Sequence, residues 1–276
     1  MRAAGVRQFG GPVGALELPG RRRLKPDEVL IEVRACGVGN WDEFARTGEW
    51  DLGRRPPMAL GVEAAGIVAA AGEQVRAVRV GDRVTAHSVP LREQGAWAEE
   101  HVVQAGHAAL LPPGVSFDAA AALTVPALTA DQAIDGLGVH AGQTVLVHGA
   151  GGVTGGLLVQ LAVHRGATVI ATAGADSADR AAALGASTVL DYRKRDWPER
   201  VRAMTGGGVD AAATPPARVR LMPCGRCGTA AGWPRSRPTC QALSGISPCV
   251  RCRSPRTAGG WATWYSSSVS ACLPFP

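Results

Sequence analysis

The sequence lacks the long apolar segments that membrane insertion needs. No stretch approaches the roughly 18 consecutive apolar residues that a helix requires to cross a bilayer. Residues 1–5 run into polar residues without the apolar core of a secretory signal. We therefore expect a cytoplasmic protein that has no membrane as a partner.

Acidic residues are absent from the last part of the chain. All 23 Asp and Glu residues lie at or before Asp210, whereas residues 214–276 contain eight Arg and no Lys. The net charge of +6 comes from this segment, because residues 1–213 carry 21 basic and 23 acidic side chains. A nucleic-acid site needs basic side chains gathered on one folded face. This distribution argues against nucleic acid as a partner.

Cysteine is scarce before the last segment. Cys36 stands alone in residues 1–213, and the other six cysteines lie from Cys224 to Cys272. A single cysteine in a body long enough for two domains indicates a reducing compartment. We expect Cys36 to pack as a small apolar residue rather than to bind a metal.

Two segments of different periodicity are present. Residues 1–115 contain short apolar runs separated by Gly and Pro, which is typical of a compact, barrel-like β domain; the runs are 28–35, 61–71, 82–86 and 100–103. From Ser116, a plausible helix N-cap, strand and helix patterns alternate. After a helix to about 134, strands are expected at 144–148, 167–172 and 188–190, and helices at 157–165, 177–184 and 197–205. This alternation predicts a doubly wound parallel sheet over residues 116–213.

The turn after the first strand of this sheet is rich in glycine. A strand–turn–helix with such a turn can place a dinucleotide diphosphate against unpaired N–H groups at a helix N-terminus. The spacing departs from G-x-G-x-x-G, because Thr154 holds the sixth place, so a purely structural turn remains the alternative. The residues expected at the cofactor are Gly149, Ala150, Gly151, Gly152, Val153, Thr154 and Gly155.

The second strand indicates which dinucleotide binds. NAD-binding folds commonly end this strand in an acid that bonds the ribose hydroxyl. Here Thr172 closes the expected strand and leaves room for a 2′-phosphate, which Arg180 in the next helix could neutralise. Asp176 lies beyond the strand end. We therefore expect NADPH as the cofactor.

These residues resemble the medium-chain dehydrogenase/reductase superfamily, in its zinc-free quinone oxidoreductase branch. Short motifs occur in the family's order and spacing over nearly all of residues 1–212, at 34–42, 60–66, 80–84, 128–130, 149–155, 184–186 and 191–192. The resemblance implies a GroES-like β-barrel domain followed by a Rossmann-type doubly wound sheet. Beyond about residue 212 the family pattern stops, so the second domain is expected to be incomplete.

The resemblance also implies an activity. Zinc-dependent relatives have a Cys where this chain has Gly39 and a His where it has Val62, so we expect no metal. Without a Lewis acid, hydride transfer from NADPH to a quinone or an α,β-unsaturated carbonyl compound is favoured over alcohol oxidation. An enoyl reductase acting on acyl thioesters and an inactive NADPH-binding pseudoenzyme remain alternatives.

Three further site residues follow from the resemblance alone. Thr129 and Tyr192 would lie near the nicotinamide and ribose, and Asn40 would lie beside the substrate. Thr129 could instead simply pack in a helix, and Asn40 is displaced by one position from the family's Asn. A homodimer is possible if the C-terminal part is intact.

Residues 214–276 do not continue the family pattern. They contain Cys224-x2-Cys227 and Cys249-x2-Cys252, which is close to a zinc-ribbon spacing. Back-translation with a one-base offset instead gives two segments with ordinary globular composition, which favours a frame-shifted segment. A zinc module and a genuine disordered tail remain the other interpretations.

The coding DNA tests the frame-shift hypothesis directly. We expect resequencing across the codons for residues 206–222 to reveal an inserted or deleted base. The corrected frame would then encode further alternating strands and helices. An unchanged frame would contradict the hypothesis, and the zinc content of the purified protein would then decide between a zinc module and a disordered tail.

Overall fold

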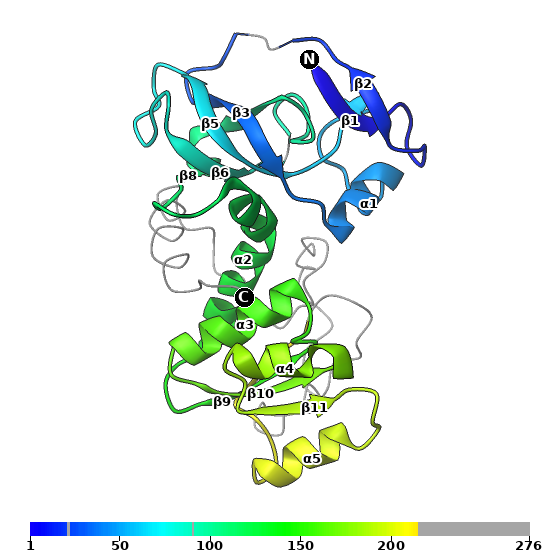
Figure 1. Ribbon diagram of the computed structural model, residues 1–276, viewed down its shortest axis with the longest axis vertical. Helices are drawn as coiled ribbons and strands as arrows, with labels where there is room; N and C mark the ends of the chain where they lie inside the picture. Colours follow the sequence, from blue (N-terminus) through cyan, green and yellow to red (C-terminus); the bar gives the residue numbers. More distant parts are fainter. Residues whose placement is uncertain (21–22, 90, 215–276) are drawn as a thin grey trace, which may run out of the picture. The chain divides into compact units, whose positions relative to one another are not determined.

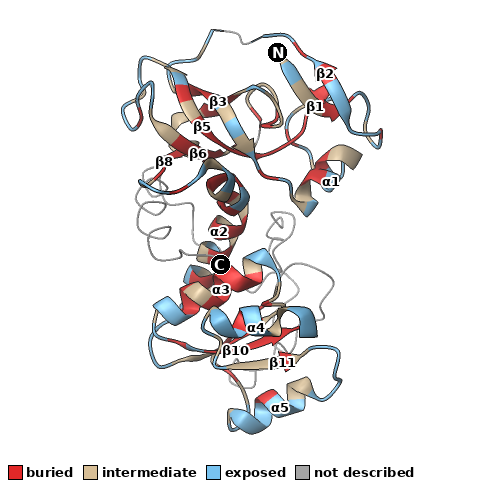
Figure 2. Ribbon diagram, viewed as in Figure 1, coloured by how far each residue is buried: buried red, intermediate tan, exposed pale blue. Residues whose placement is uncertain are grey.

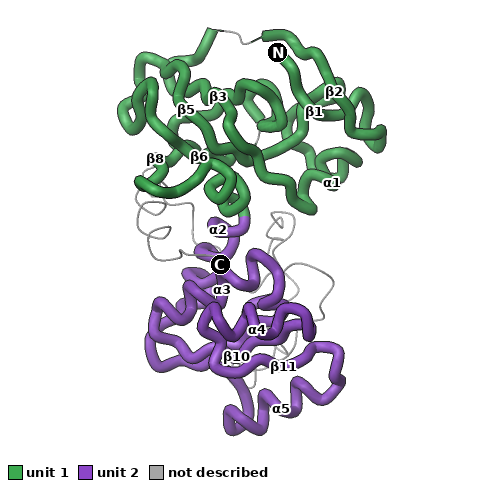
Figure 3. Tube along the Cα trace, in the orientation of Figure 1, with its two compact units in different colours: residues 1–125, 255–276 green, residues 126–254 purple. Residues whose placement is uncertain are grey.

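The structure, a computed structural model, describes residues 1–20, 23–89 and 91–214. Within these residues the chain forms two compact units, residues 1–125 and residues 126–214, which Figure 3 colours separately. Helix α2 (Phe117–Leu137) belongs to both, because the boundary falls between Val125 and Pro126. The domain boundary expected near residue 115 stays a prediction. The proposed features of the tail lie outside the described residues.

The first unit is built on two antiparallel sheets (Figure 1). The larger sheet has the order β7-β3-β5-β6-β8, and the smaller has the order β2-β1-β4. The larger sheet consists of β3 (Glu28–Cys36), β5 (Glu63–Ala71), β6 (Arg83–His87), β7 (Glu100–Gln104) and β8 (Ala108–Leu110). The smaller consists of β1 (Arg2–Val6), β2 (Gly14–Glu17) and β4 (Met58–Ala59).

One face of the larger sheet carries an apolar core. β-Branched side chains suit a buried, pleated surface. The cluster at its centre draws on all five strands, and five of its valine and isoleucine side chains are at most 1% exposed; they are Val29, Ile31, Val68, Val84 and Val103. Figure 2 shows buried residues in these strands beside intermediate and exposed ones. Two acidic residues, Glu28 and Glu63, are the first residues of β3 and β5, and both are buried.

Several elements of the first unit were not expected from the sequence. They are β1, β2, β4, β8, the helix α1 (Asn40–Thr47) and the 3-10 turn η1 (Ala105–His107). Strands β1, β2 and β8 are short and contain Ala and Gly, which have weak strand propensity, so the sequence carries little signal for them. These short segments form strands because they pair with their neighbours, β1 with β2 and β4, and β8 with β6.

The second unit contains a parallel sheet with the order β11-β10-β9-β12. Its strands are β9 (Thr144–His148), β10 (Thr168–Ala173), β11 (Thr188–Asp191) and β12 (Ala211–Ala213). Helices α3 (Val153–His164), α4 (Ala175–Ala183) and α5 (Trp197–Met204) connect them. Strands β10 and β11 lie on one side of β9, and β12 lies on the other side. The strand order therefore reverses between β9 and β12. In such sheets ligands bind at the carboxyl ends of the strands near this point.

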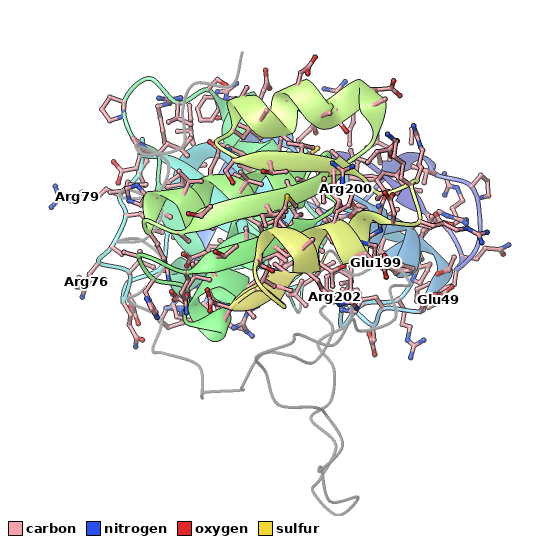
Figure 4. The ribbon with its side chains drawn as sticks, turned by 90° about the horizontal axis from the view of Figure 1, so that it is seen from below. Glu49, Arg76, Arg79, Glu199, Arg200 and Arg202 are labelled. Atoms are coloured by element: carbon pink, nitrogen blue, oxygen red, sulfur yellow. The ribbon has the colours of Figure 1, made fainter. Side chains whose placement is uncertain are left out.

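Helices cover both faces of the parallel sheet. Leu146, Ile170 and Leu190 project to the face where Val201 of α5 joins their cluster. Alternate residues such as Val145 and Val169 therefore project to the other face, and α3 and α4 contact the same strands. The charged side chains of α5 lie at the surface, as Figure 4 shows for Glu199, Arg200 and Arg202.

The predicted fold class is confirmed, with an antiparallel GroES-like half-barrel and a Rossmann-like parallel sheet. Most element boundaries differ from expectation by one or a few residues, and two of the differences lie at the glycine turn. Helix α3 begins at Val153 rather than at residue 157, since Gly155 and Gly156 weaken its helical signal without preventing the helix. Strand β10 extends to Ala173, one residue beyond Thr172. In the part of the chain that the structure describes, no helix has the length and apolarity to cross a membrane.

Candidate functional site

The turn between β9 and α3 is fixed by hydrogen bonds to β10. Gly149 has a φ of +80°, a left-handed conformation that glycine adopts without strain. Its N–H donates to both the carbonyl and the hydroxyl oxygen of Thr172, at 3.1 Å each. The Ala150 N–H donates to the same carbonyl oxygen at 2.9 Å. These bonds bend the chain sharply at the carboxyl end of β9.

The glycines of this turn have different roles. A Cβ atom at Gly155 would overlap the Gly149 carbonyl oxygen, so Gly155 lets α3 pack against the turn. A Cβ at Gly151 would overlap the hydroxyl of Ser177 in α4. At Gly152 a Cβ would meet only the Gly149 carbonyl oxygen, at 3.7 Å. Gly152 is therefore the position where another molecule can approach the backbone closely.

Helix α3 begins beside this open position. Gly152 is its N-cap and supplies no side-chain cap, and Val153 in the first turn is 57% exposed. The first N–H groups of a helix have no partner within the helix and carry partial positive charge. The backbone around Gly152 thus fits the diphosphate of a dinucleotide, which the sequence predicts for this turn.

Thr172 has a different place from the one expected. Its side chain is fully buried rather than facing the carboxyl edge of the sheet. Its hydroxyl oxygen accepts from the Gly149 N–H and lies 2.8 Å from Nδ1 of His148. Ala173 and Gly174 follow it, so the strand still ends without an acid. Thr172 anchors the turn, and the expectation that its small side chain leaves room for a 2′-phosphate stays a prediction.

Arg180 reaches back to the phosphate turn from α4. Its guanidinium donates to the Gly151 carbonyl oxygen at 2.5 Å, while Ser177 packs against the same glycine. Arg180 was expected from the sequence to neutralise a 2′-phosphate, and that role stays a prediction. The hydrogen bond of Arg180 is to Gly151 in the turn, and no contact of Arg180 with the last residues of β10 is seen in the described residues.

The end of β10 is covered by the segment that follows β11. A Cβ at Gly174 would lie 3.4 Å from Nη2 of Arg193 and 3.6 Å from Cε1 of Tyr192. Tyr192 is 45% exposed, and the Arg193 guanidinium lies 5.6 Å from its ring centre. Tyr192 was expected from the sequence, whereas Arg193 was missed. The signal was the basic run at residues 193–195, directly after Tyr192.

An aromatic group adjoins this edge of the sheet. The His148 ring stacks on Trp197 with centroids 5.2 Å apart and meets the Tyr192 ring edge-on at 6.3 Å. Burial lowers the pKa of His148, which favours the neutral ring. A neutral Nδ1 can accept the Thr172 hydroxyl hydrogen while that oxygen accepts from Gly149. The turn between β9 and α3 is therefore linked to the rings of His148 and Trp197 through the Thr172 hydroxyl.

Replacing Thr172 with valine tests this link. The substitution keeps the side-chain shape but removes a hydroxyl that contacts Gly149 and His148, each contact contributing about 1 kcal/mol. We expect the dissociation constant for NADPH to rise about tenfold, as measured by fluorescence titration. Thr172→Ser should retain the affinity of the wild type. Equal affinity in the valine variant would show that the hydroxyl does not shape the turn.

Asn40 and Thr129 lie in different units. Asn40 is the exposed first residue of α1, and Thr129 is half-buried in the part of α2 that belongs to the second unit. Their proposed places beside the substrate and the nicotinamide stay predictions.

Two of the carboxyl groups that are buried in the first unit have no salt bridge to a cation among the residues that the structure describes. Glu63, at the start of β5, is 1% exposed, and Asp42 of α1 is 3% exposed. Asp42 Oδ2 accepts from the Gly39 N–H at 2.8 Å, and among the described residues its Oδ1 has no partner. Burial raises the pKa of Asp42 to about 6 and, with the added effect of Asp42, that of Glu63 to about 8. Glu63 therefore keeps its proton at neutral pH.

Cys36 differs from its expected environment. It is exposed at the end of β3, on the same alternating side as the exposed Arg34, and is not packed in the core. Partial burial, Asp42 and Glu63 all raise the pKa of its thiol. Sequence alone could not show this, because the last residues of β3 extend beyond its buried half.

The buried carboxyls predict a pH-dependent stability. An unfolded chain ionises Glu63 near its ordinary pKa, whereas the folded protein holds the proton up to about pH 8. The folded state then binds more protons, so its free energy of unfolding falls as the pH rises. From about pH 7 to about pH 8.5 we expect a loss of about 1.5 kcal/mol in urea unfolding. Glu63→Gln should flatten this slope, and an unchanged slope in that variant would contradict the assignment.

The histidines do not form a metal site with these groups. His87 Nδ1 lies 3.0 Å from the Val62 carbonyl oxygen, and His101 bonds Ser88 at 2.7 Å. Within the described ranges, no three His, Cys, Asp or Glu side chains are grouped so that they could hold a metal ion. Gly39 and Val62, at the positions of the zinc ligands in zinc-dependent relatives, have no side-chain donor.

Comparisons with known sequences identify both units. The alcohol dehydrogenase GroES-like domain family matches residues 25–113, and the zinc-binding dehydrogenase family matches residues 153–218. The chain is 37% identical to a synaptic vesicle membrane protein VAT-1 homolog of Danio rerio, over 71% of this chain and 40% of that protein. It is 35% identical to a quinone oxidoreductase of Lama guanicoe, over 80% of this chain and 68% of the relative.

A solved structure agrees with the sequence comparisons. Escherichia coli quinone oxidoreductase complexed with NADPH matches with a TM-score of 0.64 and 32% identity, over 76% of this chain and 64% of that chain. The chain spans less than half the length of the VAT-1 homologues that it matches. The chain belongs to the medium-chain dehydrogenase/reductase superfamily, in the branch that contains the quinone oxidoreductases and the VAT-1 homologues.

Proposed function

We propose that this chain forms part of an NADPH-dependent, zinc-independent reductase of quinones or α,β-unsaturated carbonyl compounds. The observation that carries the proposal is the β9–turn–α3 segment, where Gly152 leaves the backbone accessible at the positive end of a helix. Quinone oxidoreductases among the relatives support the substrate class, and the relative from Escherichia coli was solved with NADPH bound.

Each residue set has a defined task in this proposal. When bound, NADPH supplies a hydride from C4 of its nicotinamide to an electrophilic conjugated acceptor. The start of α3 would hold the diphosphate, and the Thr172 bonds to Gly149 would keep that backbone in position. Thr129 would lie beside the nicotinamide and Asn40 beside the acceptor. Gly39 and Val62 offer no metal ligand, so the acceptor must be activated by its own conjugation.

The choice of NADPH over NADH rests on the end of β10. No acid occupies this position, and Arg193 and Tyr192 lie beside Gly174, where the ribose 2′-position is held in dinucleotide folds. A guanidinium can form charge-assisted bonds to a phosphate. Arg193, rather than Arg180, is therefore the proposed partner of the 2′-phosphate, and Arg180 supports the turn through Gly151.

A panel of acceptors tests the activity. The purified full chain is mixed with NADPH and, in turn, a quinone, an enone, an enoyl thioester and a simple ketone, and loss of NADPH absorbance is followed. We expect turnover with the quinone or enone and none with the ketone. Preference for the thioester would indicate an enoyl reductase. NADPH binding without turnover on any acceptor would reject the proposed activity in favour of a pseudoenzyme.

Substitution of Arg193 tests the cofactor choice. Loss of a charge-assisted contact of about 1.5–3 kcal/mol predicts that Arg193→Gln weakens NADPH binding at least tenfold and changes NADH binding little. Arg180→Gln should weaken both cofactors alike, because it contacts the turn at Gly151. Arg200→Gln, on the surface of α5 (Figure 4), serves as the matched control. Equal effects of Arg193→Gln on the two cofactors would refute this assignment.

A further inference from the structure

Helix α2 contains a proline where it passes from the first unit to the second. Pro126 lies inside the helix, directly after the boundary at Val125. Proline has no N–H, so the Ala122 carbonyl loses its helical donor, and the ring crowds the preceding turn. The helix is therefore intrinsically weak one turn before Thr129, a residue of the proposed active site.

Two polar contacts hold the helix just before this break. Glu63 Oε2 accepts the Val125 N–H at 2.7 Å. The Thr124 hydroxyl lies 2.5 Å from the Thr85 hydroxyl of β6, and it also donates to the Ala120 carbonyl at 2.8 Å. Both contacts link the larger sheet of the first unit to consecutive residues of α2. The hydroxyl contact is buried and the Val125 contact is partly buried, so water competes less for them than at the surface.

The position of the Glu63 carboxyl is enforced by its surroundings. A Cβ at Gly37 would overlap the carboxyl group, with the Glu63 Cδ at 2.5 Å. Glycine at this position thus leaves the space that the carboxyl fills. Gly37 has no positive φ, so the backbone itself would accept another residue. The Glu63 side chain therefore both fills the space beside Gly37 and accepts the Val125 N–H.

We propose that Glu63 is a positioning residue whose carboxyl holds α2 at Val125, before the Pro126 break, and thereby steadies the helical segment that carries Thr129. The inference rests on the proposed hydride-transfer function for its catalytic consequence, but the contact with the helix can be tested without any activity.

The charge state of Glu63 suits this task. The titratable groups around it are Asp42 on α1, Cys36 on β3 and His87, its register partner on β6. None of these supplies a positive charge at neutral pH, because burial lowers the pKa of His87 to about 4. A protonated carboxyl offers a neutral acceptor oxygen to the Val125 N–H. The amide of glutamine can offer the same acceptor, whereas leucine cannot.

Amide hydrogen exchange on the full chain tests the contact. In Glu63→Leu we expect the amides of residues 121–130 to exchange at least fivefold faster than in the wild type, because the acceptor is lost. In Glu63→Gln they should exchange within about twofold of the wild-type rate. Unchanged exchange in the leucine variant would overturn the proposal.

A second variant reaches the carboxyl without altering it. Gly37→Ala should displace the Glu63 side chain and raise exchange over the same residues. Gly14→Ala is the matched control, since a Cβ there meets nothing within 4 Å. Equal exchange in the two alanine variants would also overturn the proposal.

Kinetics separate positioning from a proton-donor role. Glu63→Leu should lower kcat about tenfold and leave NADPH affinity within about twofold, while Glu63→Gln keeps both near wild type. If the glutamine variant loses as much kcat as the leucine variant, the proton matters and the positioning role is refuted. If the wild type itself oxidises no NADPH, the proposed function fails, and the exchange result alone then decides whether Glu63 holds the helix.

Discussion

The paired hydrogen bonds from Gly149 and Ala150 to Thr172 are the contact on which the proposed site depends. They tie the end of β9 to β10 and force the left-handed bend at Gly149. Helix α3 consequently begins at the carboxyl edge of the sheet, where its unpaired N–H groups lie beside the open backbone of Gly152. Because the Thr172 hydroxyl also meets His148, the same bonds connect the turn to the aromatic ring of Trp197.

The first unit buries carboxyl groups rather than relying on a backbone turn. Its core is apolar, yet Glu63 and Asp42 are buried in the same unit, with no ion pair to a cation within the described ranges. Such groups cost stability unless their polar atoms are satisfied. Glu63 accepts a hydrogen bond from the backbone of α2 at Val125. In our proposal this bond holds the helix against the sheet. The second unit, in contrast, satisfies its turn through backbone groups and one hydroxyl.

The sequence predicted the elements with strong periodicity. Strands such as β3 and β9 carry runs of valine and isoleucine or leucine, and the glycine turn was expected between its strand and helix, where the structure has it. Short strands such as β1 lacked this signal, because their residues are mostly small and their pairing depends on distant segments.

Side-chain directions were harder to predict. Arg180 and Arg193 are both basic residues downstream of β10, and only the packing of α4 and of the segment after β11 distinguishes the residue at Gly151 from the one at Gly174. Thr172 is similarly buried because both faces of the sheet are covered by helices, so successive residues of β10 are buried whichever face they point to. The exposure of Cys36 follows from the outer half of β3, whose extent the sequence did not show. In each case the missing information was three-dimensional.

The most direct measurement is a calorimetric titration of the full chain and its Gly152→Val variant with NADPH. Of Gly151, Gly152 and Gly155, Gly152 is the one where a Cβ meets no atom closer than 3.7 Å, so a valine there would block the diphosphate while disturbing the fold little. The account predicts saturable binding to the wild type and a loss of at least a hundredfold in the variant, or about 2.7 kcal/mol, at an unchanged melting temperature. Equal binding by both proteins would contradict it.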